Sequence, residues 1–493
     1  MSDFWAGVQI WFQNFNARFG IAALIVLGIL VFALIMYSVI KTVIAGQSKE
    51  RKVQLRAKMA DGNIRQRATE SLCEMIRFET TPDNRAELKR LTAYIKKRYP
   101  RLFAAAKIEN SDCGLLICLK AKKSELKPLL FCGHLDVVPA GSGWKHPPFG
   151  GKRDGGKIYG RGACDCKGPV TAMLEAIEDL LCDEQLPKRD LWFAFGGDEE
   201  AGGEQGAGVF AQIMEEKKLD FELILDEGGY IAKSHSDSND FPIALIGTGE
   251  KQNCYFTLKA SGEGGHSGMP RGRTALSVLA EAVYRIEMIG NKKKLTHMAK
   301  RFICQSMPAM SFGKRYLAAN MPFTSPFIKK AFANDFEVGS LMGNTLVPTR
   351  VQGSDADNML VSHAECVINA QLLPNHSAEK TLAFIKRLVA DLEIDVTMSG
   401  AAEKVKLTST DSEMYKTLCE ILKERYPGIP CLEWISSGCS NAAHYGELSD
   451  CILHFTPIVM EKKTAFSAHG AEERISEESL AAAVEIYKKL MVI

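Results

Sequence analysis

Short hydrophobic segments that end in acidic residues or histidine constrain the fold of this chain more than any other sequence feature. Three of them occupy residues 128–132, 191–195 and 221–225. Their length and continuous hydrophobicity are typical of strands that are buried on both faces of a sheet. The residues that follow are His134 and Asp136 after the first segment, Asp198, Glu199 and Glu200 after the second, and Asp226 and Glu227 after the third.

The segment between the first two strands predicts a helix. Hydrophobic residues in 169–181 recur with the 3.6-residue period of a helix. Strands that alternate with helices form a parallel sheet, and the carboxyl ends of parallel strands meet at the edge where α/β proteins bind ligands. We therefore expect the acidic residues and His134 to gather in one site.

The residue types at this expected site favour a hydrolytic metal centre. Taken singly, a histidine after a strand is more often structural, and adjacent acids such as Glu199 and Glu200 usually lie in a solvated turn. Their joint occurrence at three strand ends is harder to explain in that way. Carboxylates and imidazole, without clustered thiols, are typical of a catalytic zinc site rather than a structural one.

Two cysteines flank Asp165 and raise three alternatives: a thiolate metal site, a redox pair, or an aspartate with incidental neighbours. A thiolate site needs a second cysteine pair, and the sequence shows none at suitable spacing. In an extended segment Cys164 and Cys166 share one face, and Asp165 points to the other. We therefore predict that Asp165 is the ligand. A redox sensor would instead need a reactive cysteine of low pKa.

Residues 20–40 form an uncharged hydrophobic segment that is long enough for a helix to cross about 30 Å of hydrocarbon. A cleaved signal peptide has a basic start and a shorter apolar core, whereas Asp3 and Arg18 are the only charged residues before this segment. A buried core helix of this length would normally have a polar face. We therefore predict a single-pass membrane anchor.

Charge and cysteine content weakly favour a cytoplasmic catalytic domain. Basic residues predominate in 41–58, where Glu50 is the only acid, and positive flanks usually stay on the cytoplasmic side. The 14 cysteines show no disulfide-framework spacing, which suits a reducing compartment. The net charge of +2, without a basic stripe, argues against a nucleic-acid partner.

Six motifs in order resemble the signatures of one enzyme family. They are GHLDVVP, W…PPFGG…GGKIYGRGACDCKG, GGDEEAGG, LDEGG, GEGGHSGMP and HGAEERI. They look like those of the dinuclear-zinc metallopeptidases, which include aminoacylases, glutamate carboxypeptidases, dipeptidases and succinyl-diaminopimelate desuccinylase. The resemblance runs from Asn63 to the C-terminus. The anchor and a long lid insertion are most similar to the branch of carboxypeptidase S and the N-acyl-amino-acid hydrolases.

The resemblance implies a site with two zinc ions per subunit, although cobalt or manganese could serve with these ligands. The implied ligands are His134, Asp165, Glu200, Asp226 and His469, with Asp165 bridging both metals. Asp136 would orient His134, and Glu199 would remain free as the general base. Such a metal pair lowers the pKa of a shared water toward about 7.

The substrate-binding positions implied by the resemblance are less regular. His266 is similar to the lid histidine that reaches the partner subunit's active site, which implies a homodimer. Asn358 matches the family's asparagine, and Arg271 is a candidate for binding a substrate carboxylate. Ala443 stands where an arginine usually grips that carboxylate. Gln371 and Asn441 also replace a usual arginine and a usual aspartate.

The resemblance also implies a domain organisation in the α/β class. We expect a mixed-sheet catalytic domain with helices on both faces, and a smaller inserted α/β lid that dimerises. The expected boundaries are 1–19 for an N-terminal segment, 20–40 for the transmembrane anchor, 41–59 for a basic linker, 60–248 and 402–493 for the catalytic domain, and 249–401 for the lid. Within the lid, 291–345 is expected to be helical packing, or a surface for membrane or an acyl chain.

The sequence therefore predicts a membrane-anchored, zinc-dependent hydrolase that acts on amide bonds of small peptides or N-acyl-amino acids. A dipeptidase with altered carboxylate recognition is one alternative. A metal-binding but catalytically inactive homologue is another, although the intact ligand and base positions argue against it.

Overall fold

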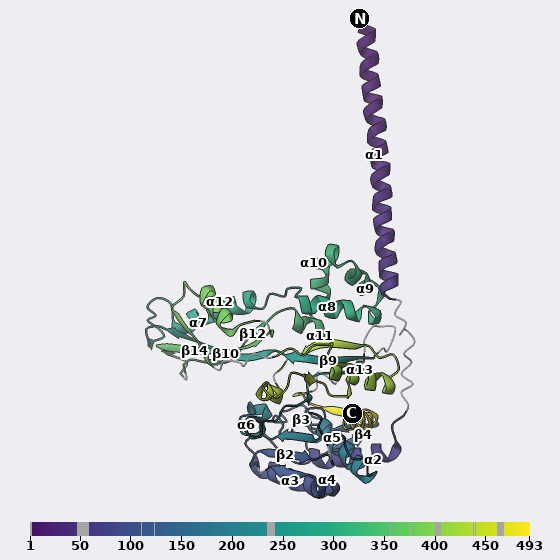
Figure 1. The fold of residues 1–493 in the computed structure, drawn as a ribbon. Helices are drawn as coiled ribbons and strands as arrows, with labels where there is room; N and C mark the ends of the chain where they lie inside the picture. The colour runs from purple at the N-terminus through teal and green to yellow at the C-terminus, as the bar shows by residue number, and fades with distance from the viewer. Residues whose placement is uncertain are drawn as a thin grey trace.

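The computed structural model describes residues 2–46, 59–109, 111–122, 124–233, 242–354, 356–374, 376–399, 406–436, 438, 440–460 and 468–493. Most of the predicted basic linker, residues 47–58, lies outside this part of the chain. Figure 1 shows a long N-terminal helix, the predicted catalytic body, which contains the C-terminus, and the predicted lid, which extends to one side.

The catalytic body is built on a ten-stranded mixed sheet with the order β1-β2-β6-β3-β7-β17-β9-β8-β18, in which β16 also pairs with β9. Its strands are β1 (Lys107–Glu109), β2 (Gly114–Leu119), β3 (Leu129–His134), β6 (Leu191–Gly196), β7 (Leu223–Asp226), β8 (Tyr230–Lys233), β9 (Pro242–Glu250), β16 (Cys431–Ser436), β17 (Ile452–His454) and β18 (Val459–Met460). Strand β3 is parallel to β6 and β7, whereas β2 is antiparallel to β6. The α/β class with a mixed sheet is therefore confirmed.

The three predicted strands are β3, β6 and β7, which are neighbours in the sheet. Their alternate residues pack into different hydrophobic clusters. Leu129 and Phe131 of β3 pack on one face with helices α2, α5 and α15, whereas Leu130 and Cys132 pack on the other face with α6. Burial on both faces explains why the strands have no polar alternation.

Helices cover both faces of this sheet. They are α2 (Gly62–Ile76), α3 (Arg85–Arg98), α4 (Pro100–Ala105), α5 (Lys167–Cys182), α6 (Ala207–Glu216), α13 (Glu413–Arg425) and α15 (Glu477–Leu490), with the short helices η1 (Glu199–Ala201) and η4 (Asn441–Tyr445). The predicted helix over 169–181 is α5, and it packs against α15. A small sheet of β4 (Lys152–Asp154), β5 (Lys157–Tyr159) and β19 (Arg474–Ser476) joins the two ends of the catalytic chain.

The lid has a separate antiparallel sheet with the order β12-β14-β10-β15. Its elements are β10 (Gln252–Ser261), β12 (Thr345–Gln352), β14 (His363–Leu372), β15 (Ile394–Ser399), α7 (Ala275–Arg285), η2 (Ile286–Gly290) and α12 (Ala378–Leu388). Residues including Phe256, Leu279 and Ile385 form a core of their own between this sheet and its helices. At the lid tip, β11 (Gly265–His266) pairs with β13 (Met359–Leu360).

A group of helices between α7 and β12 forms the helical insertion, which we define as residues 297–341. It contains α8 (His297–Ser306), η3 (Met307–Ala309), α9 (Phe312–Ala319), α10 (Met321–Phe332) and α11 (Phe336–Leu341). Phe302, Ile328 and Phe332 of the insertion pack in one cluster with Tyr230 and Trp434 of the catalytic sheet.

The N-terminal helix α1 (Ser2–Ala45) contains a segment, Ala22–Ala45, that is long and apolar enough to cross a membrane. Most of its side chains are exposed, and its C-terminal turns contact α9. Figure 1 shows α1 leaving the body beside α9 and α10, on the side away from the catalytic sheet.

Candidate metal centre and active-site cavity

The ends of parallel strands and two loops bring the candidate ligands together. His134 is the last residue of β3, and Glu200 lies in η1 just beyond β6. Asp165 comes from the loop before α5, and His469 comes from the loop before β19. The sheet edge predicted from the sequence is therefore the edge at which these side chains meet.

Asp165 lies between two histidines. Its Oδ1 atom is 2.9 Å from Nε2 of His134, and its Oδ2 atom is 3.2 Å from Nε2 of His469. The same Nε2 atom of His469 is 3.1 Å from Oε1 of Glu200. Because the two carboxylate oxygens face different imidazoles, this aspartate has the geometry of a group that can bridge two cations.

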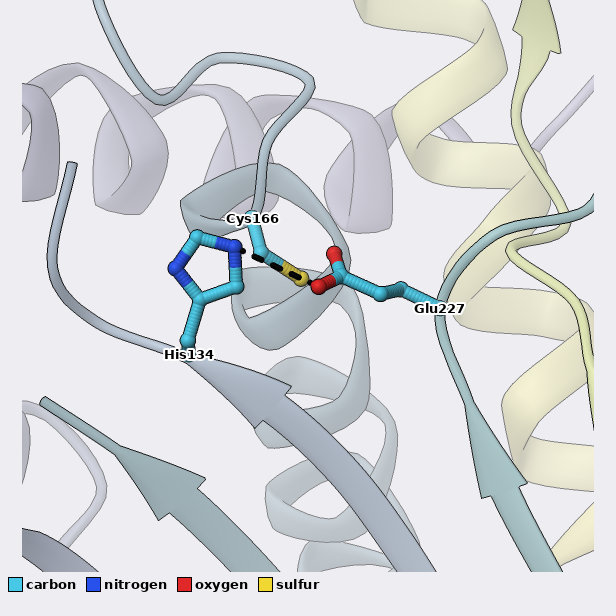
Figure 2. Close-up of side chains that lie close together, drawn as sticks. All are labelled: His134, Cys166 and Glu227. Atoms are coloured by element: carbon cyan, nitrogen blue, oxygen red, sulfur yellow. Dashed lines mark ion pairs between the residues drawn. The ribbon is translucent and has the colours of Figure 1, made fainter. Parts of the chain in front are cut away.

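Glu227 also points toward His134, and the sequence analysis gave it no role. Its Oε1 atom is 3.4 Å from Nε2 of His134. Figure 2 shows its carboxylate turned toward the imidazole, with the thiol of Cys166 beside the line that joins them. Ligand atoms of His134, Cys166 and Glu227, and likewise of His134, Asp165 and Glu200, lie within 4.8 Å of one another.

Asp226, which the sequence analysis assigned as a ligand, is not brought to this cluster. Its side chain is buried, and its Oδ2 atom accepts a hydrogen bond from the amide of Ala442 at 2.7 Å. Its Oδ1 atom accepts from the amide of Glu227 at 2.9 Å. Successive residues of a strand point to opposite faces, so Asp226 and Glu227 cannot both face His134. Alternation of side chains along an extended segment leaves either Asp226 or Glu227 as the ligand, and the sequence pattern alone does not choose between them.

Asp136 supports the site through its backbone and its side chain. Its carbonyl oxygen lies 3.0 Å from Nδ1 of His134, which leaves Nε2 to face the cluster. Its carboxylate accepts hydrogen bonds from the amides of Glu199 and Glu200 at 3.1 and 3.0 Å. The residue therefore fixes both the imidazole and the turn that carries the two glutamates.

Glu473 is a buried supporting residue that sequence reasoning missed, although it belongs to the HGAEERI motif. Its carboxylate accepts hydrogen bonds from the amides of Gly162, Cys164 and Asp165 at 3.0, 2.7 and 3.1 Å. It also pairs with the guanidinium of Arg161 at 2.8 Å. Glu473 thus ties the loop that carries Asp165 to the loop that carries His469.

The crowding of acids shifts the proton equilibria of the cluster. Burial, together with repulsion from Glu200 and Asp165, raises the pKa of Glu199 to about 8 against the attraction of His134. Hydrogen bonds to Asp165 and Glu200 raise the pKa of the His469 imidazole to about 10. The cluster offers carboxylate oxygens and imidazole nitrogens, which are ligands that divalent cations accept. They come from Asp165, Glu199, Glu200, Glu227, His134 and His469.

The two cysteines beside Asp165 do not have the properties of reactive thiols. Both are buried, and burial raises their thiol pKa well above the usual value. The thiol of Cys164 donates to the carbonyl of Arg474 at 3.0 Å. A redox sensor requires the opposite shift, because the thiolate is the reactive form.

A cavity of about 840 Å³ opens over the cluster. Asp165, Glu199, Glu200, Glu227 and His469 line its floor. Further lining residues include three groups: Asn253, Tyr255 and Gln371 from the lid sheet, Tyr230, Trp434 and Met460 as an aromatic and apolar wall, and Asn441, Ala443 and His444 from η4.

The other predicted substrate residues lie at the lid tip and do not line this cavity. His266 and Asn358 are exposed, and the amide of Ser267 donates to the Asn358 carbonyl at 3.1 Å, so these segments are adjacent. The side chain of Arg271 is 85% exposed and lies 4.0 Å from Glu263. Within one subunit, the structure therefore keeps His266, Asn358 and Arg271 apart from the metal cluster.

Comparison with known proteins assigns the family. The model of Peptidase family M20/M25/M40 matches residues 130–492. The chain belongs to this family. It is therefore a hydrolase of amide bonds, and the resemblance inferred from the six motifs is confirmed.

Curated relatives match along most of their length. A probable carboxypeptidase S-like protein from Dictyostelium discoideum is 30% identical over 413 residues, covering 82% of this chain and 79% of the relative. An N-fatty-acyl-amino acid synthase/hydrolase from Xenopus tropicalis is 26% identical over 430 residues, covering 84% and 82%.

Solved structures share the fold. An M20 family metallo-carboxypeptidase from Sulfolobus solfataricus aligns with a TM-score of 0.66 at 19% identity, covering 86% of this chain and 98% of that one. Human carnosine dipeptidase 1 aligns with a TM-score of 0.63 at 17% identity, covering 87% and 96%. At these identities the likeness shows that the architecture is that of the family.

Proposed function

We propose that this chain is a membrane-anchored, zinc-dependent hydrolase of amide bonds in small peptides or N-acyl-amino acids. The observation that carries the proposal is the placement of Asp165 between His134 and His469. Glu199 lines the same cavity and is not needed as a metal ligand. The family membership supports metal-dependent hydrolysis, and the donor set supports a pair of divalent ions.

The ligand set that we propose differs from the sequence-based set at one position. His134 and Glu227 would hold one ion, His469 and Glu200 would hold the other, and Asp165 would contact both. Zinc suits these nitrogen and carboxylate donors, and cobalt or manganese would also be accepted. When bound, such a pair supplies an activated water and polarises the amide carbonyl.

Glu199 would act as the general base and then as the general acid. It lies at the cavity floor, and its Oε2 atom is 3.9 Å from Nε2 of His134. Its amide is fixed by Asp136, which holds the residue in place without engaging its carboxylate. The carboxylate would accept a proton from the attacking water and deliver it to the leaving amine.

The cavity lining favours substrates that are recognised by neutral and apolar groups. Among the described residues that line the cavity, none is lysine or arginine, and Ala443 lies there instead. Tyr230 and Trp434 form an edge-to-face aromatic pair with ring centroids 6.1 Å apart, which suits an acyl chain or a large apolar side chain. A dipeptidase with altered carboxylate recognition remains the alternative.

A homodimer is part of the proposal because one subunit does not bring the lid histidine to the cavity. His266 and Asn358 are exposed at the lid tip, where a second subunit could receive them. The imidazole would then stabilise the oxyanion of the tetrahedral intermediate. The proposed anchor is α1, whose segment Ala22–Ala45 has the required length and composition.

The proposed function is tested by measuring amino-acid release by the full-length protein in detergent, loaded with zinc. The substrates are N-acyl-amino acids and dipeptides, each with a free or an amidated C-terminus. Cleavage of any of them, lost on chelation and restored by zinc, supports the proposal. A preference for amidated substrates would mark altered carboxylate recognition. Zinc binding without cleavage of any substrate would favour the inactive homologue.

A further inference from the structure

We propose that helices α9 and α10 lie on the bilayer that α1 enters, with their phenyl rings among the lipid headgroups. The inference rests on the proposed anchoring by α1. Phe312 at the start of α9 is 55% exposed, and Phe323 and Phe327 of α10 are 75% and 65% exposed. Phe323 and Phe327 are four residues apart, so their rings lie on the same face of the helix.

The hydrophobicity of α10 is divided between an inner and an outer face. Ile328 is fully buried and Phe332 is 2% exposed, and both belong to the core cluster that joins the insertion to the catalytic sheet. The outer phenyl rings are therefore not needed for that core. Single exposed hydrophobic residues are common, but adjacent exposed phenyl rings on one helix face indicate a surface that contacts an apolar environment.

A polar contact fixes these helices against the end of α1. Asn320, between α9 and α10, is 4% exposed. Its side-chain amide lies 3.5 Å from the carbonyl of Ser38 and 3.4 Å from Oγ1 of Thr42. Ser38 and Thr42 are buried, although most of α1 is exposed. The contact therefore sets the height of α9 and α10 along the axis of α1.

Asn320 contacts α1 at the level where the hydrocarbon core of a bilayer would end. A helix needs about 20 residues to cross a hydrocarbon core of about 30 Å. A span that starts at Ala22, where the apolar segment of α1 begins, therefore ends near Lys41, the first charged residue after it. Asn320 contacts Ser38 and Thr42, within three residues of Lys41, so it lies at the boundary between hydrocarbon and water.

The charge of this surface complements an anionic membrane. Residues 312–332 contain Lys314, Arg315, Lys329 and Lys330 and no acidic residue. The three lysines are exposed, whereas Arg315 is buried and donates to the carbonyl of Met310. Lysines beside exposed phenyl rings are typical of helices that lie in the headgroup region, where basic residues are attracted to anionic lipids.

Continuity with α1 favours lipid over a second protein copy as the occupant. Figure 1 shows α9 and α10 on the side of the body from which α1 leaves, with the lid sheet extending sideways. A bilayer that contains α1 would cover this side of the body. A protein partner there would have to share the same space with lipid.

The test uses the full-length protein in nanodiscs of phosphatidylcholine and phosphatidylserine that contain a lipid with a photoactivatable group near its headgroup. Crosslinked peptides are mapped by mass spectrometry. We expect crosslinks in 312–332 as well as in α1. In the double variant Phe323→Ser, Phe327→Ser, crosslinks in 312–332, counted relative to α1, should decrease about fivefold because most of the inserted apolar surface is removed.

A matched control replaces two other exposed lid residues, Tyr284→Ser and Met288→Ser, which are 63% and 57% exposed. This variant should leave the crosslinks unchanged. Crosslinks in α1 without crosslinks in 312–332 would overturn the inference while leaving the anchor intact. Crosslinks in 312–332 that persist unchanged in the double variant would also overturn it. Absence of crosslinks in α1 would show that the anchoring itself, and with it the inference, is wrong.

Discussion

The substitution Glu473→Gln tests how the site is held together. Oε2 of Glu473 accepts from Arg161 and from the amide of Gly162, and Oε1 accepts from the amides of Cys164 and Asp165. Glutamine offers one acceptor oxygen and one NH₂ group. Whichever way its amide is turned, the NH₂ group faces two N–H donors.

Both orientations are costly because the position is fully buried. If the NH₂ group faces Cys164 and Asp165, two buried amides lose their acceptor at about 1–3 kcal/mol each. Glutamine is neutral, so the buried guanidinium of Arg161 loses its counter-charge in either orientation, and breaking a buried pair on one side costs about 3–5 kcal/mol. We therefore expect a loss of at least about 4 kcal/mol of stability in the catalytic domain in either orientation.

The matched control is Glu477→Gln, four residues away. Glu477 pairs with Arg153 through two contacts of 2.9 and 3.0 Å, but the Arg153 side chain is 53% exposed. An exposed ion pair contributes about 1 kcal/mol or less. The same chemical change should therefore have a much smaller effect at this position.

The assay is thermal unfolding of the purified full-length protein, followed by its zinc affinity in competition with a chelator. We expect Glu473→Gln to lower the apparent unfolding temperature by about 5–10 °C and Glu477→Gln by about 2 °C or less. Because Glu473 holds the Asp165 loop, zinc affinity should also decrease by about 10–100-fold in the first variant alone. Equal effects of the two substitutions would refute the reasoning.

Three further predictions concern the metal cluster. Glu199→Gln should retain metal and lower turnover by about 10³-fold or more, since proton transfer and water positioning both fail; substantial remaining activity would mean that another group is the base. Glu227→Gln should lose about one of two zinc ions by elemental analysis, whereas Asp226→Asn should keep both and lower stability; the reverse result would restore the sequence-based ligand. Without metal, protonated His469 stabilises the folded protein, because its pKa is about 10 in the folded state and about 6.5 in the unfolded chain. This stabilisation is complete below pH 6.5 and is lost as pH rises toward about 10. Metal must displace that proton, so zinc affinity should rise with pH over the same range, and a flat profile would contradict the assignment of His469.

The sequence predicted those elements in which the spacing of hydrophobic residues fits only one type of secondary structure. Strands β3, β6 and β7 and helix α5 occur where their patterns predicted them, because their hydrophobic residues are buried on both sheet faces or along one helix stripe. For the Asp165 loop, the sequence also predicted a carboxylate turned away from its two cysteine neighbours. Both thiols are buried, and the carboxylate faces the histidines.

The roles of other residues depend on tertiary contacts, which the local pattern of the sequence does not reveal. Asp226 and Glu227 are adjacent acids at a strand end, and which of them faces His134 depends on the register of β7 with its neighbours. The role of Glu473 depends on contacts with residues more than 300 positions earlier in the chain. The position of Asn320 against α1 likewise follows from packing between distant segments.

The aromatic wall of the cavity and the inner face of α10 belong to one packed cluster. Tyr230 and Trp434 line the cavity, and they share their hydrophobic core with Ile328 and Phe332 of α10. A close-packed interior transmits displacement, so a shift of α10 must be accommodated at the cavity wall. If α10 contacts lipid, the composition and lateral pressure of the bilayer become effectors of substrate affinity. By linkage, occupancy of the cavity would in turn change how strongly the enzyme binds the membrane surface.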